Sequence, residues 1–449
     1  MNPFPIPKAL REYGRVFRDA GRQAWLVGGA LRDMILGKKV NDWDVATDAP
    51  AREVAKMFPR VIPTGLQHGT VTVLWKGLTI ETTTFRVDGN YGDGRRPDSV
   101  TFTSDIREDL RRRDFTMNSL AYNLETGELL DPHQGRADLA AGLVRAIGDP
   151  LERFTEDGLR PLRAIRFASQ LGYRIDPDTL AAIPRTLENF RRVSIERVRD
   201  ELVKVLLSPR PSYGLNLLEE TGMLPHILPE LSACRGVEQK GFHRFDVLDH
   251  SFLSCDGAPD KIELRIAALL HDIGKPAARA EGPDGLPTFH RHEELSARAA
   301  EEALRRLKFS NAVISAVVHL VRHHMFAYDD SWSDAAVRRF LARTGPENLE
   351  DLLALRLADA YGTTGTPPDP RGLDPLRKRV RDLLERSRAL SIRDLAIDGN
   401  DLASLGVPRG PVMGRILAEL LETVLDDPEL NTPERLLDIA GKIKGKYGV

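Results

Sequence analysis

Short segments in the first third of the chain alternate apolar and polar positions with a period of two, which is the pattern of β-strands. Turn residues separate these segments, and a few helical stretches lie between them. Five segments show the pattern most clearly: residues 24–29 (AWLVGG), 43–47 (WDVAT), 69–75 (GTVTVLW), 78–85 (LTIETTTF) and 119–124 (SLAYNL). The pattern predicts a mixed α/β domain at the N-terminus.

From about residue 150, the strand pattern gives way to the period of amphipathic helices. Clear examples are residues 156–171, 195–207, 261–273 and 297–307, with proline and glycine between them. A Gly- and Pro-rich stretch at 362–375 predicts a linker. We therefore expect an α+β chain with four parts: an α/β head (1–145), an all-helical neck (146–215), a helical body (216–363) and a helical tail (376–449).

Composition supports several domains in a reducing compartment. The chain has 449 residues, of which 41% are apolar, and this exceeds what one hydrophobic core usually serves. Cys234 and Cys255 cannot make a disulfide framework and form no CxxC motif. The N-terminus lacks the pattern of a signal peptide, and no apolar run approaches the roughly 18 residues of a membrane span. We expect a cytoplasmic protein with no membrane partner.

The charge balance argues against a protein that coats nucleic acid by bulk attraction. The formal net charge is −2, whereas such proteins need a strongly basic domain. RNA contacts would therefore be local, at basic clusters such as 111–113, 185–199, 377–379 and 442–446. Each cluster taken alone is more typical of a solvated helix face than of an RNA contact.

Two motifs near the N-terminus suit a nucleoside triphosphate and metal ions. Gly28 and Gly29 lie between an apolar strand and a helical pattern, so the N–H groups of a helix N-terminus and the side chain of Arg32 can meet phosphates. Asp42 and Asp44 are one residue apart on a predicted strand, which points both carboxylates to one face. Crowded carboxylates repel unless cations lie between them, and two Mg²⁺ ions there would activate a hydroxyl and neutralise a triphosphate.

Glu81 is a weaker candidate for a third acidic group near these ions. It lies in the strand pattern of residues 78–85, where alternation leaves its side chain on one face. A solvent-facing strand glutamate explains it equally well.

The run GGALRDMILGKKVNDWDVAT (28–47) resembles the signature of the class II tRNA nucleotidyltransferase and bacterial poly(A) polymerase family. Three further segments match that family in order: 111–119 resemble its ribose and triphosphate motif, 131–139 its hinge loop and 156–168 its base-selecting helix. The resemblance is clearest from about residue 24 to 210. It implies catalytic, metal-holding roles for Asp42 and Asp44, and nucleotide-binding roles for Gly28, Gly29, Arg32, Arg113, Asp114, Asn118, Asp157, Arg160, Arg163 and Arg166.

This resemblance implies an enzyme that adds C, C and A to the tRNA 3′ end from CTP and ATP, with Mg²⁺ and without a nucleic-acid template. The helical remainder would hold tRNA by its phosphates and its shape. The polar, Gly-rich segment 86–99 lies where the family has a loop needed for switching to ATP, which favours addition of the final A; an ordinary hairpin connection is the alternative. A poly(A) polymerase or an A-adding enzyme shares these motifs and stays open.

Base selection can be argued from Asp157 and Arg160, which are three residues apart on a predicted helix and so share a face. Cytosine and adenine both show an amino donor beside a ring acceptor, whereas uracil and guanine place a carbonyl where the amino group would be. A carboxylate beside a guanidinium would therefore favour CTP and ATP. The alternative is a surface ion pair.

A second group of residues predicts another metal site. The order of His250, His271-Asp272 and Asp359 resembles the HD phosphohydrolase superfamily, whose metal ligands they would be, with His292 and His323 as additional ligands. His324 is an alternative to His323. Imidazoles and carboxylates in this set would hold one or two divalent ions (Mn²⁺, Ni²⁺ or Fe²⁺) and activate water for phosphate hydrolysis.

Three alternatives stay open at this point. The helical body can be a degenerate HD fold with a structural role only. The HD-type segment can instead be the main activity, a phosphohydrolase whose N-terminal part only binds nucleotide. A non-catalytic RNA-binding protein is disfavoured, because binding alone needs no paired strand carboxylates. The motifs specify no oligomeric state.

Overall fold

The computed structural model describes residues 6–40, 42–89, 100–239, 244–283, 285–329, 331–386 and 389–447. The chain forms two compact units, Met1–Ala233 with Arg305–Phe309, and Cys234–Leu304 with Ser310–Val449. Within the described ranges, the structure contains no helix with the length and apolar character needed to cross a membrane. The predicted division into four parts is finer than these two units and stays a prediction.

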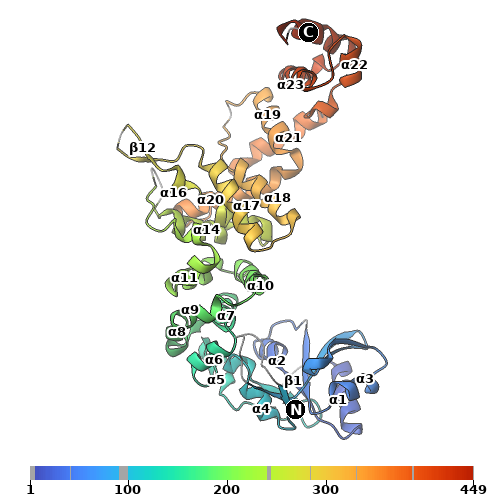
Figure 1. The fold of residues 1–449 in the computed structure, drawn as a ribbon, viewed down its shortest axis with the longest axis vertical. Coiled ribbons are helices and arrows are strands. Elements are labelled where there is room, and N and C mark those ends of the chain that lie inside the picture. The colour runs from blue at the N-terminus through green and yellow to red at the C-terminus, as the bar shows by residue number, and fades with distance from the viewer. Residues whose placement is uncertain are drawn as a thin grey trace. The chain divides into compact units, whose positions relative to one another are not determined.

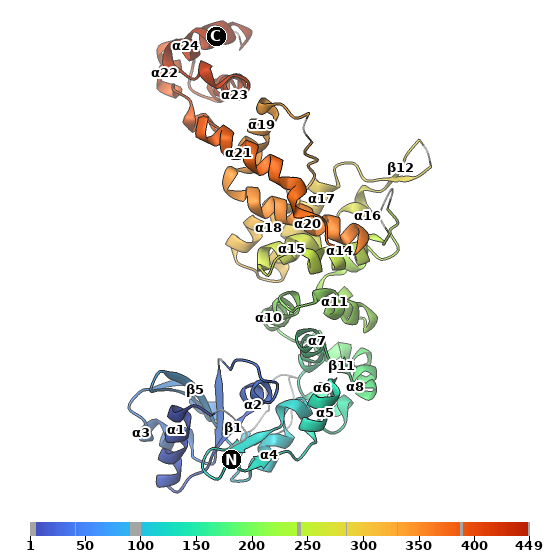
Figure 2. The same cartoon turned by 180° about the vertical axis from the view of Figure 1, so that it is seen from behind.

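A seven-stranded sheet forms the centre of the first unit (Figures 1 and 2). The strand order is β3-β4-β5-β2-β1-β8-β9, and the pairing is antiparallel except between β2 and β5. The bounds are β1 Ala24–Val27, β2 Trp43–Thr47, β3 Val61–Gly65, β4 Thr70–Trp75, β5 Leu78–Thr84, β8 Ala121–Asn123 and β9 Leu129–Leu130. All five predicted strands are present. The sequence pattern missed β3, where Pro63 and exposed neighbours hide any alternation.

The two faces of this sheet have different cores. On one face, Tyr13 of α1 stacks on Phe58 with ring centroids 4.4 Å apart, and its hydroxyl lies 2.7 Å from Thr82 Oγ1. Both views show α1 and α3 together on one side of the sheet. A second core joins Trp25 of β1 and Ala46 of β2 with residues of α4. Because Asp44 is two residues from Ala46, it lies on this second face.

Helices of the first unit follow the predicted head and neck. Those around the sheet are α1 Lys8–Asp19, α2 Gly28–Ile35, α3 Ala51–Met57, α4 Ile106–Arg111 and α5 Gly135–Ala141. The helices that follow are α6 Pro150–Glu156, α7 Arg160–Leu171, α8 Pro177–Ala182, α9 Leu187–Phe190, α10 Ile195–Leu206, α11 Pro211–Glu220, α12 Leu224–Ile227 and α13 Pro229–Ser232.

Three short strand pairs accompany these elements. Two are antiparallel, β6 Arg86–Asp88 with β7 Val100–Phe102, and β12 Ala280–Glu281 with β13 Pro287–Thr288; the parallel pair is β10 Leu143–Val144 with β11 Arg174–Ile175. The predicted all-helical part therefore includes a few two-residue strands. The 3₁₀ helices are η1 Leu66–His68, η2 Thr116–Asn118, η3 Pro184–Thr186, η4 Pro346–Asn348, η5 Pro370–Leu373, η6 Ile392–Asp394, η7 Pro428–Leu430 and η8 Gly445–Tyr447.

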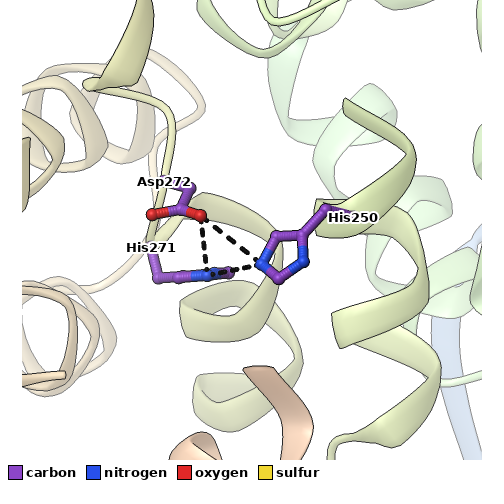
Figure 3. Close-up of side chains that lie close together, drawn as sticks. All are labelled: His250, His271 and Asp272. Atoms are coloured by element: carbon purple, nitrogen blue, oxygen red, sulfur yellow. Dashed lines mark hydrogen bonds and ion pairs between the residues drawn. The ribbon is translucent and has the colours of Figure 1, made fainter. Parts of the chain in front are cut away.

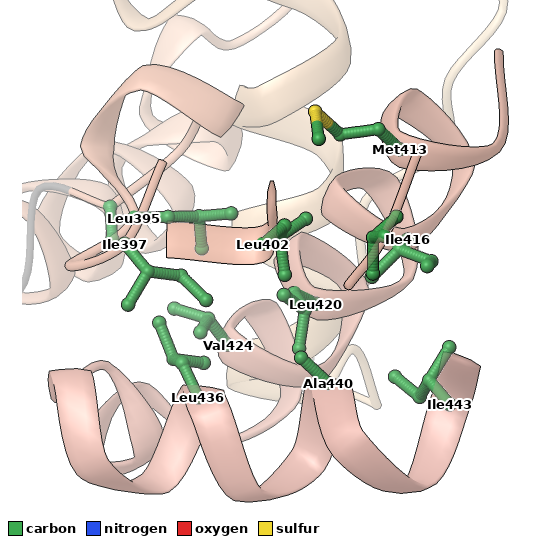
Figure 4. Close-up of a cluster of buried hydrophobic side chains, with 12 residues drawn as sticks. Leu395, Ile397, Leu402, Met413, Ile416, Leu420, Val424, Leu436, Ala440 and Ile443 are labelled. Atoms are coloured by element: carbon green, nitrogen blue, oxygen red, sulfur yellow. The ribbon is translucent and has the colours of Figure 1, made fainter. Parts of the chain in front are cut away.

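Among its described residues, the second unit contains helices and the one strand pair β12–β13. Its helices are α14 Val247–Gly257, α15 Ile262–Leu270, α16 Lys275–Ala278, α17 His292–Arg306, α18 Asn311–His323, α19 Asp334–Thr344, α20 Leu349–Thr364, α21 Asp374–Arg386, α22 Gly399–Ser404, α23 Pro411–Asp426 and α24 Pro433–Lys444. The last three helices share an apolar core that includes Leu402, Leu420 and Leu436 (Figure 4).

The predicted linker at 362–375 is too long, because α20 continues to Thr364 and α21 begins at Asp374. Gly362 is part of α20 and faces α14. A Cβ at this position would lie 2.0 Å from Ser254 Oγ and 2.6 Å from the backbone oxygen of His250. Glycine is needed here for close packing of two helices, whereas the sequence pattern suggested a chain break.

Candidate active site

A cavity of about 420 Å³ in the first unit brings together the ten residues for which nucleotide-binding roles were predicted. They come from segments far apart in the chain: α2, the segment after α4, and α7. The lining residues are Gly28, Gly29, Arg32, Asp44, Arg112, Arg113, Asp114, Asn118, Asp157, Arg160, Arg163, Arg166, Phe167 and Arg197. Seven of them are arginines and three are aspartates, so the lining is strongly cationic and suits a polyanionic ligand.

The glycine turn after β1 places α2 at the edge of the cavity. Gly28 has φ of +69°, which an L side chain rarely adopts, and a Cβ there would lie 3.3 Å from both Asp44 Oδ2 and Arg113 Nη1. The N-terminus of α2, which begins at Gly28, therefore lies beside the carboxylate of β2. The predicted strand, glycine turn and helix are confirmed.

The two aspartates of the metal motif lie at the start of β2. Asp42 precedes the strand and is exposed, whereas Asp44 is half-buried at its second position. Asp44 pairs in register with Glu81 of the parallel strand β5, so the two side chains share a face. Burial, together with the negative charge of Glu81 and Asp42, raises the pKa of Asp44 to about 6. Negative charge is therefore concentrated here beyond what Arg113 neutralises.

A chain of hydrogen bonds joins α2 to α7 across the cavity. Arg32 Nη1 donates to Asn118 Oδ1 at 2.9 Å, and Asn118 Nδ2 donates to Asp114 Oδ1 at 3.0 Å. Arg163 donates to Asp114 Oδ2 through Nε at 2.8 Å and Nη2 at 2.6 Å. Burial opposes the charged form of Asp114, but Arg163 and Asn118 hold its pKa well below the usual range. The carboxylate thus fixes two arginines that face the cavity.

Asp157 and Arg160 both line the cavity, but the single helix predicted for them is wrong. α6 ends at Glu156 and α7 begins at Arg160. The Asp157 carboxylate accepts a hydrogen bond from the Leu159 backbone N–H at 3.0 Å, which holds the chain in a turn between the two helices, and Pro161 fits only the first turn of a new helix. Spacing alone did not reveal this break.

The partners of this pair also differ from the prediction. Asp157 Oδ2 accepts from Arg197 Nη2 of α10 at 2.8 Å, whereas Arg160 pairs with Glu156 and donates to the Arg112 backbone oxygen at 3.1 Å. Arg197 Nη1 is buried and has no hydrogen-bond partner in the part of the chain that the structure describes. Arg197 is a cavity residue that the motif comparison missed.

Phe167 and Glu201 hold the side chain of Arg166 in place, and the sequence analysis identified neither residue. The Arg166 guanidinium lies 3.7 Å from the centroid of the Phe167 ring and 2.6 Å from Glu201 Oε2. Burial lowers the pKa of Arg166 to about 10, so the side chain keeps its charge at neutral pH. Arginines recur every three residues along α7, at positions 160, 163 and 166. This spacing in the sequence indicates that α7 has one cationic face.

The segment 86–99 was expected to be the loop that permits a switch to ATP. Residues 86–88 form β6, whose partner β7 begins at Val100. Residues 90–99 lie outside the described part of the chain, so this expectation stays a prediction.

The second unit brings together five of the six predicted HD-type residues. His250 of α14 and His271 lie with their Nε2 atoms 3.1 Å apart, and Asp272 Oδ2 lies 3.4 and 3.2 Å from them (Figure 3). Asp359 Oδ1 lies 3.3 Å from His250 Nε2. His292 Nε2 approaches the other oxygen of Asp272, Oδ1, at 3.1 Å.

His323 does not join this cluster, and its prediction as a ligand is corrected. Its ring contacts His319, with centroids 4.7 Å apart, whereas the buried His324 has its Nε2 3.3 Å from His292 Nε2. One residue along a helix rotates a side chain by about 100°, so adjacent histidines cannot both face one point. Burial lowers the pKa of His324 to about 3, which keeps the ring neutral.

Three families match successive parts of the chain. Residues 24–145 match the poly A polymerase head domain, 172–234 the probable RNA and SrmB-binding site of polymerase A, and 289–440 the putative domain 2 of tRNA nucleotidyltransferase. The first covers β1 to β10, including Asp42 and Asp44.

Full-length relatives are similar over nearly the whole chain. The CCA-adding enzyme of Levilactobacillus brevis is 36% identical over 413 residues, which is 90% of both chains, and that of Geobacillus stearothermophilus is 34% identical over 93% of this chain and 92% of its own. The crystal structure of Bacillus stearothermophilus CCA-adding enzyme in complex with CTP has a TM-score of 0.74 at 28% identity and covers 98% of each chain. From its cavity, its fold and these similarities, the chain belongs to the family of CCA-adding enzymes, which are nucleotidyltransferases.

Proposed function

We propose that this chain adds C, C and A to the 3′ end of tRNA from CTP and ATP, without a nucleic-acid template. The observation that carries the proposal is the single cavity in which Asp44 meets seven arginines and Asp157. The relatives named CCA-adding enzyme, one of them solved in complex with CTP, support the same substrates.

Asp42 and Asp44 would hold divalent metal ions, and we assign Mg²⁺. Oxygen-only ligands suit this hard cation. Burial raises the pKa of Asp44, and the negative charge of Glu81 and Asp42 raises it further; a cation would neutralise that charge. Glu81, in register with Asp44, is the candidate for a third carboxylate. When bound, Mg²⁺ supplies activation of the primer hydroxyl and neutralisation of the triphosphate.

The arginines position the nucleotide for in-line attack. The 3′-oxygen of tRNA forms a bond to the α-phosphorus while the bond from that phosphorus to the pyrophosphate oxygen breaks, and pyrophosphate leaves. Arg32 and Arg113 flank the N-terminus of α2, where backbone N–H groups also meet phosphate oxygens. Arg163, held by Asp114, keeps its guanidinium fixed at the cavity wall. The positive charge of these arginines lowers the free energy needed to bring the triphosphate close to the carboxylates of Asp42 and Asp44.

Asp157 would select the base. Its Oδ2 is oriented by Arg197 and its Oδ1 by the Leu159 N–H, so the carboxylate is fixed and keeps lone pairs for an amino group of cytosine or adenine. Arg160, or the unused Nη1 of Arg197, would donate to the adjacent ring nitrogen. UTP and GTP would set a carbonyl oxygen against the carboxylate and leave buried groups unpaired.

A product assay with three tRNA ends tests this function. The purified full chain is incubated with Mg²⁺ and tRNA that lacks CCA, ends in C or ends in CC, with CTP and ATP supplied separately and together. We expect CTP alone to complete CC, ATP to add one residue to CC ends, and growth to stop at CCA. ATP incorporation on CC ends alone would indicate an A-adding enzyme, and long A tails a poly(A) polymerase; either result rejects the proposal.

A further inference from the structure

Asp109 of α4 is a buried carboxylate that is not among the residues lining the nucleotide cavity, yet it holds two arginines that are. We propose that Asp109 is a positioning residue for nucleotidyl transfer: it keeps Arg113 from pairing with Asp44, so that Asp44 stays free to bind a metal ion. The inference rests on the proposed transferase function and adds to it a residue that touches neither the nucleotide nor the metal.

Both oxygens of Asp109 accept hydrogen bonds from arginines. Oδ1 accepts from Arg112 Nε at 3.0 Å and Nη2 at 2.7 Å, and Oδ2 accepts from Arg113 Nη2 at 3.1 Å. The backbone N–H of Arg86, in β6, also donates to Oδ1, at 3.3 Å. Burial opposes the charged form of Asp109, but Arg113 and Arg112 hold its pKa below the usual value. Asp109 is therefore a buried charge with partners on both oxygens.

Arg113 lies between Asp109 and Asp44. Its Nη2 donates to Asp109, whereas its Nη1 and Asp44 Oδ2 each lie 3.3 Å from the place that a Cβ on Gly28 would take. Burial and the charge of Glu81 raise the pKa of Asp44, and the nearby guanidinium of Arg113 lowers it. Among the described residues, the ion-pair partner of Arg113 is Asp109. Two carboxylates thus compete for one guanidinium, and the buried one holds it.

The outcome of this competition decides whether Asp44 can bind a cation. A guanidinium paired with Asp44 would occupy the lone pairs that a divalent ion needs, and its charge would repel the ion. With Asp109 as its partner, Arg113 still lines the cavity, where its charge can meet a phosphate. Asp44 then keeps its lone pairs for the metal.

Asp109 also acts on the base side of the cavity through Arg112. Two hydrogen bonds to Asp109 fix the Arg112 side chain, and the Arg112 backbone oxygen accepts from Arg160 Nη2 at 3.1 Å. Arg112 lines the nucleotide cavity and also a smaller cavity of about 230 Å³ that contains Asp44 and Glu81. One buried carboxylate therefore orients arginines beside the acidic residues assigned to metal binding.

Stability of the fold is a weaker explanation for the buried charge. Ile106 and Leu110, which are near Asp109 in α4, belong to an apolar core. Replacing a buried ion pair by apolar residues of similar volume is often neutral or stabilising, so an apolar side chain would serve the packing here as well. A role in the active site explains both the charge and its choice of partners.

Metal binding without nucleotide tests the inference. Metal-free, full-length protein is titrated with Mn²⁺, free Mn²⁺ is measured by electron paramagnetic resonance, and the binding that disappears in Asp44→Asn is assigned to the Asp44 site. We expect Asp109→Asn to raise the dissociation constant of this site about fivefold or more, because the released guanidinium pairs with Asp44. Asp109→Glu keeps the charge and should stay within about twofold of the parent.

Asp105→Ala is the matched control on the same helix. It removes the N-cap of α4 and so loosens the helix, but Asp105 accepts from the Arg107 N–H and not from the cavity arginines. Mn²⁺ binding at the Asp44 site should therefore match that of the parent. An unchanged constant in Asp109→Asn, an equal rise in Asp105→Ala, or no binding lost in Asp44→Asn overturns the inference.

Removing Arg113 separates this role from a structural one. In Arg113→Met the Asp44 site should bind Mn²⁺ at least as tightly as in the parent, and adding Asp109→Asn should then change the constant by less than about twofold. The same weakening by Asp109→Asn in both backgrounds contradicts the inference. Circular dichroism melting checks the fold. If Asp109→Asn alone does not fold, Arg113→Met decides the question, because weaker Mn²⁺ binding by the folded variant rejects the inference.

The Mg²⁺ dependence of CTP incorporation separates this inference from the proposed function. Asp109→Asn should need about fivefold more Mg²⁺ for half-maximal incorporation into tRNA lacking CCA, and excess Mg²⁺ should restore most of kcat because the ion displaces the guanidinium. A loss of kcat that excess Mg²⁺ does not restore overturns the inference, while CCA addition by the parent supports the proposed function. If the parent adds no CCA, the proposed function fails and the Mn²⁺ titrations still test Asp109.

Discussion

The cavity of the first unit and the histidine cluster of the second are opposite solutions to the problem of burying charge. The cavity of the first unit is lined by seven arginines and three aspartates, so its lining favours an anionic ligand. Each arginine is held by a carboxylate, a backbone carbonyl or an aromatic ring. The cluster of the second unit brings together four imidazole nitrogens and two carboxylates, whose lone pairs favour cations.

Asp44 is one of three aspartates in the arginine-rich cavity, and removing its charge should have the largest effect on nucleotidyl transfer. Asp44→Asn should reduce the rate of CTP incorporation by about 1,000-fold or more, because a lost metal ligand costs about 4 kcal/mol of transition-state stabilisation. Quenched-flow incorporation into tRNA lacking CCA measures it. Asp48→Asn, a carboxylate on the same segment that accepts from the Gln23 N–H, is the matched control. A loss of less than tenfold would exclude Asp44 as a ligand.

Asp157 should affect the discrimination between CTP and UTP more than the rate of CTP incorporation. In Asp157→Asn the side-chain amide can donate to a carbonyl, so the preference for CTP over UTP should fall by about 2 kcal/mol, or roughly 30-fold. The ratio of kcat/KM for the two nucleotides is the readout. Glu152→Gln, an exposed residue of α6 outside the cavity, should keep the wild-type ratio. An unchanged ratio in Asp157→Asn would remove the carboxylate from base selection.

The raised pKa of Asp44 predicts a pH-dependent cost to stability. The folded state holds the proton more tightly than the unfolded chain, so stability is unaffected below about pH 4, falls as pH rises through about 6, and stays reduced above that. The difference between 3.8 and about 6 corresponds to at most about 3 kcal/mol, and to about 1.5 after allowance for solvent. Asp44→Asn should therefore stabilise metal-free protein at pH 8 and not at pH 4.

Urea unfolding followed by tryptophan fluorescence in chelator measures this effect, since Trp25, Trp43 and Trp75 all lie in the first unit. Saturating Mg²⁺ should remove the stabilisation at pH 8, because the ion neutralises the charge in the wild-type protein. Equal stabilisation at both pH values would show that the carboxylate is not the cause.

Arg197→Met should have the smallest effect of the three substitutions, because Arg197 acts through Asp157. Arg197→Met should cost about 1 kcal/mol, or fivefold, in kcat/KM for CTP and ATP and should weaken discrimination against UTP, and Arg197→Lys should restore part of the discrimination. Arg199→Met, on the same helix but paired with Asp200, is the control. If Arg197→Met discriminates against UTP as strongly as the wild-type protein does, then Arg197 has a structural role only.

Local chemistry was predictable from the sequence where it depended on neighbouring residues. The turn at Gly28, the strand with Asp44 and the arginine spacing of α7 all follow from periodicity and glycine geometry. Partners from distant segments were not predictable. Arg197 reaches Asp157 only because α10 packs against α7. The helix break before Arg160 depends on the local hydrogen bond from the Leu159 N–H to the Asp157 carboxylate, which competes with helix continuation.

The histidine cluster shows the same limit. The order of His250, His271, Asp272 and Asp359 predicted a shared site, and the structure brings these side chains together. The choice between His323 and His324 depended on the rotation of α18, which two adjacent candidates in the sequence could not specify. Gly362 looked like a linker residue because its role, close packing of α20 on α14, involves a segment more than a hundred residues away.

The central claim is that nucleotidyl transfer belongs to the cavity of the first unit and not to the histidine cluster. The most direct measurement compares Asp42→Asn and His271→Gln for Mg²⁺-dependent incorporation of CTP and ATP into tRNA lacking CCA. The account predicts loss of incorporation by at least 100-fold in Asp42→Asn and a rate within about twofold of wild type in His271→Gln. Full incorporation by Asp42→Asn together with its loss in folded His271→Gln would contradict it.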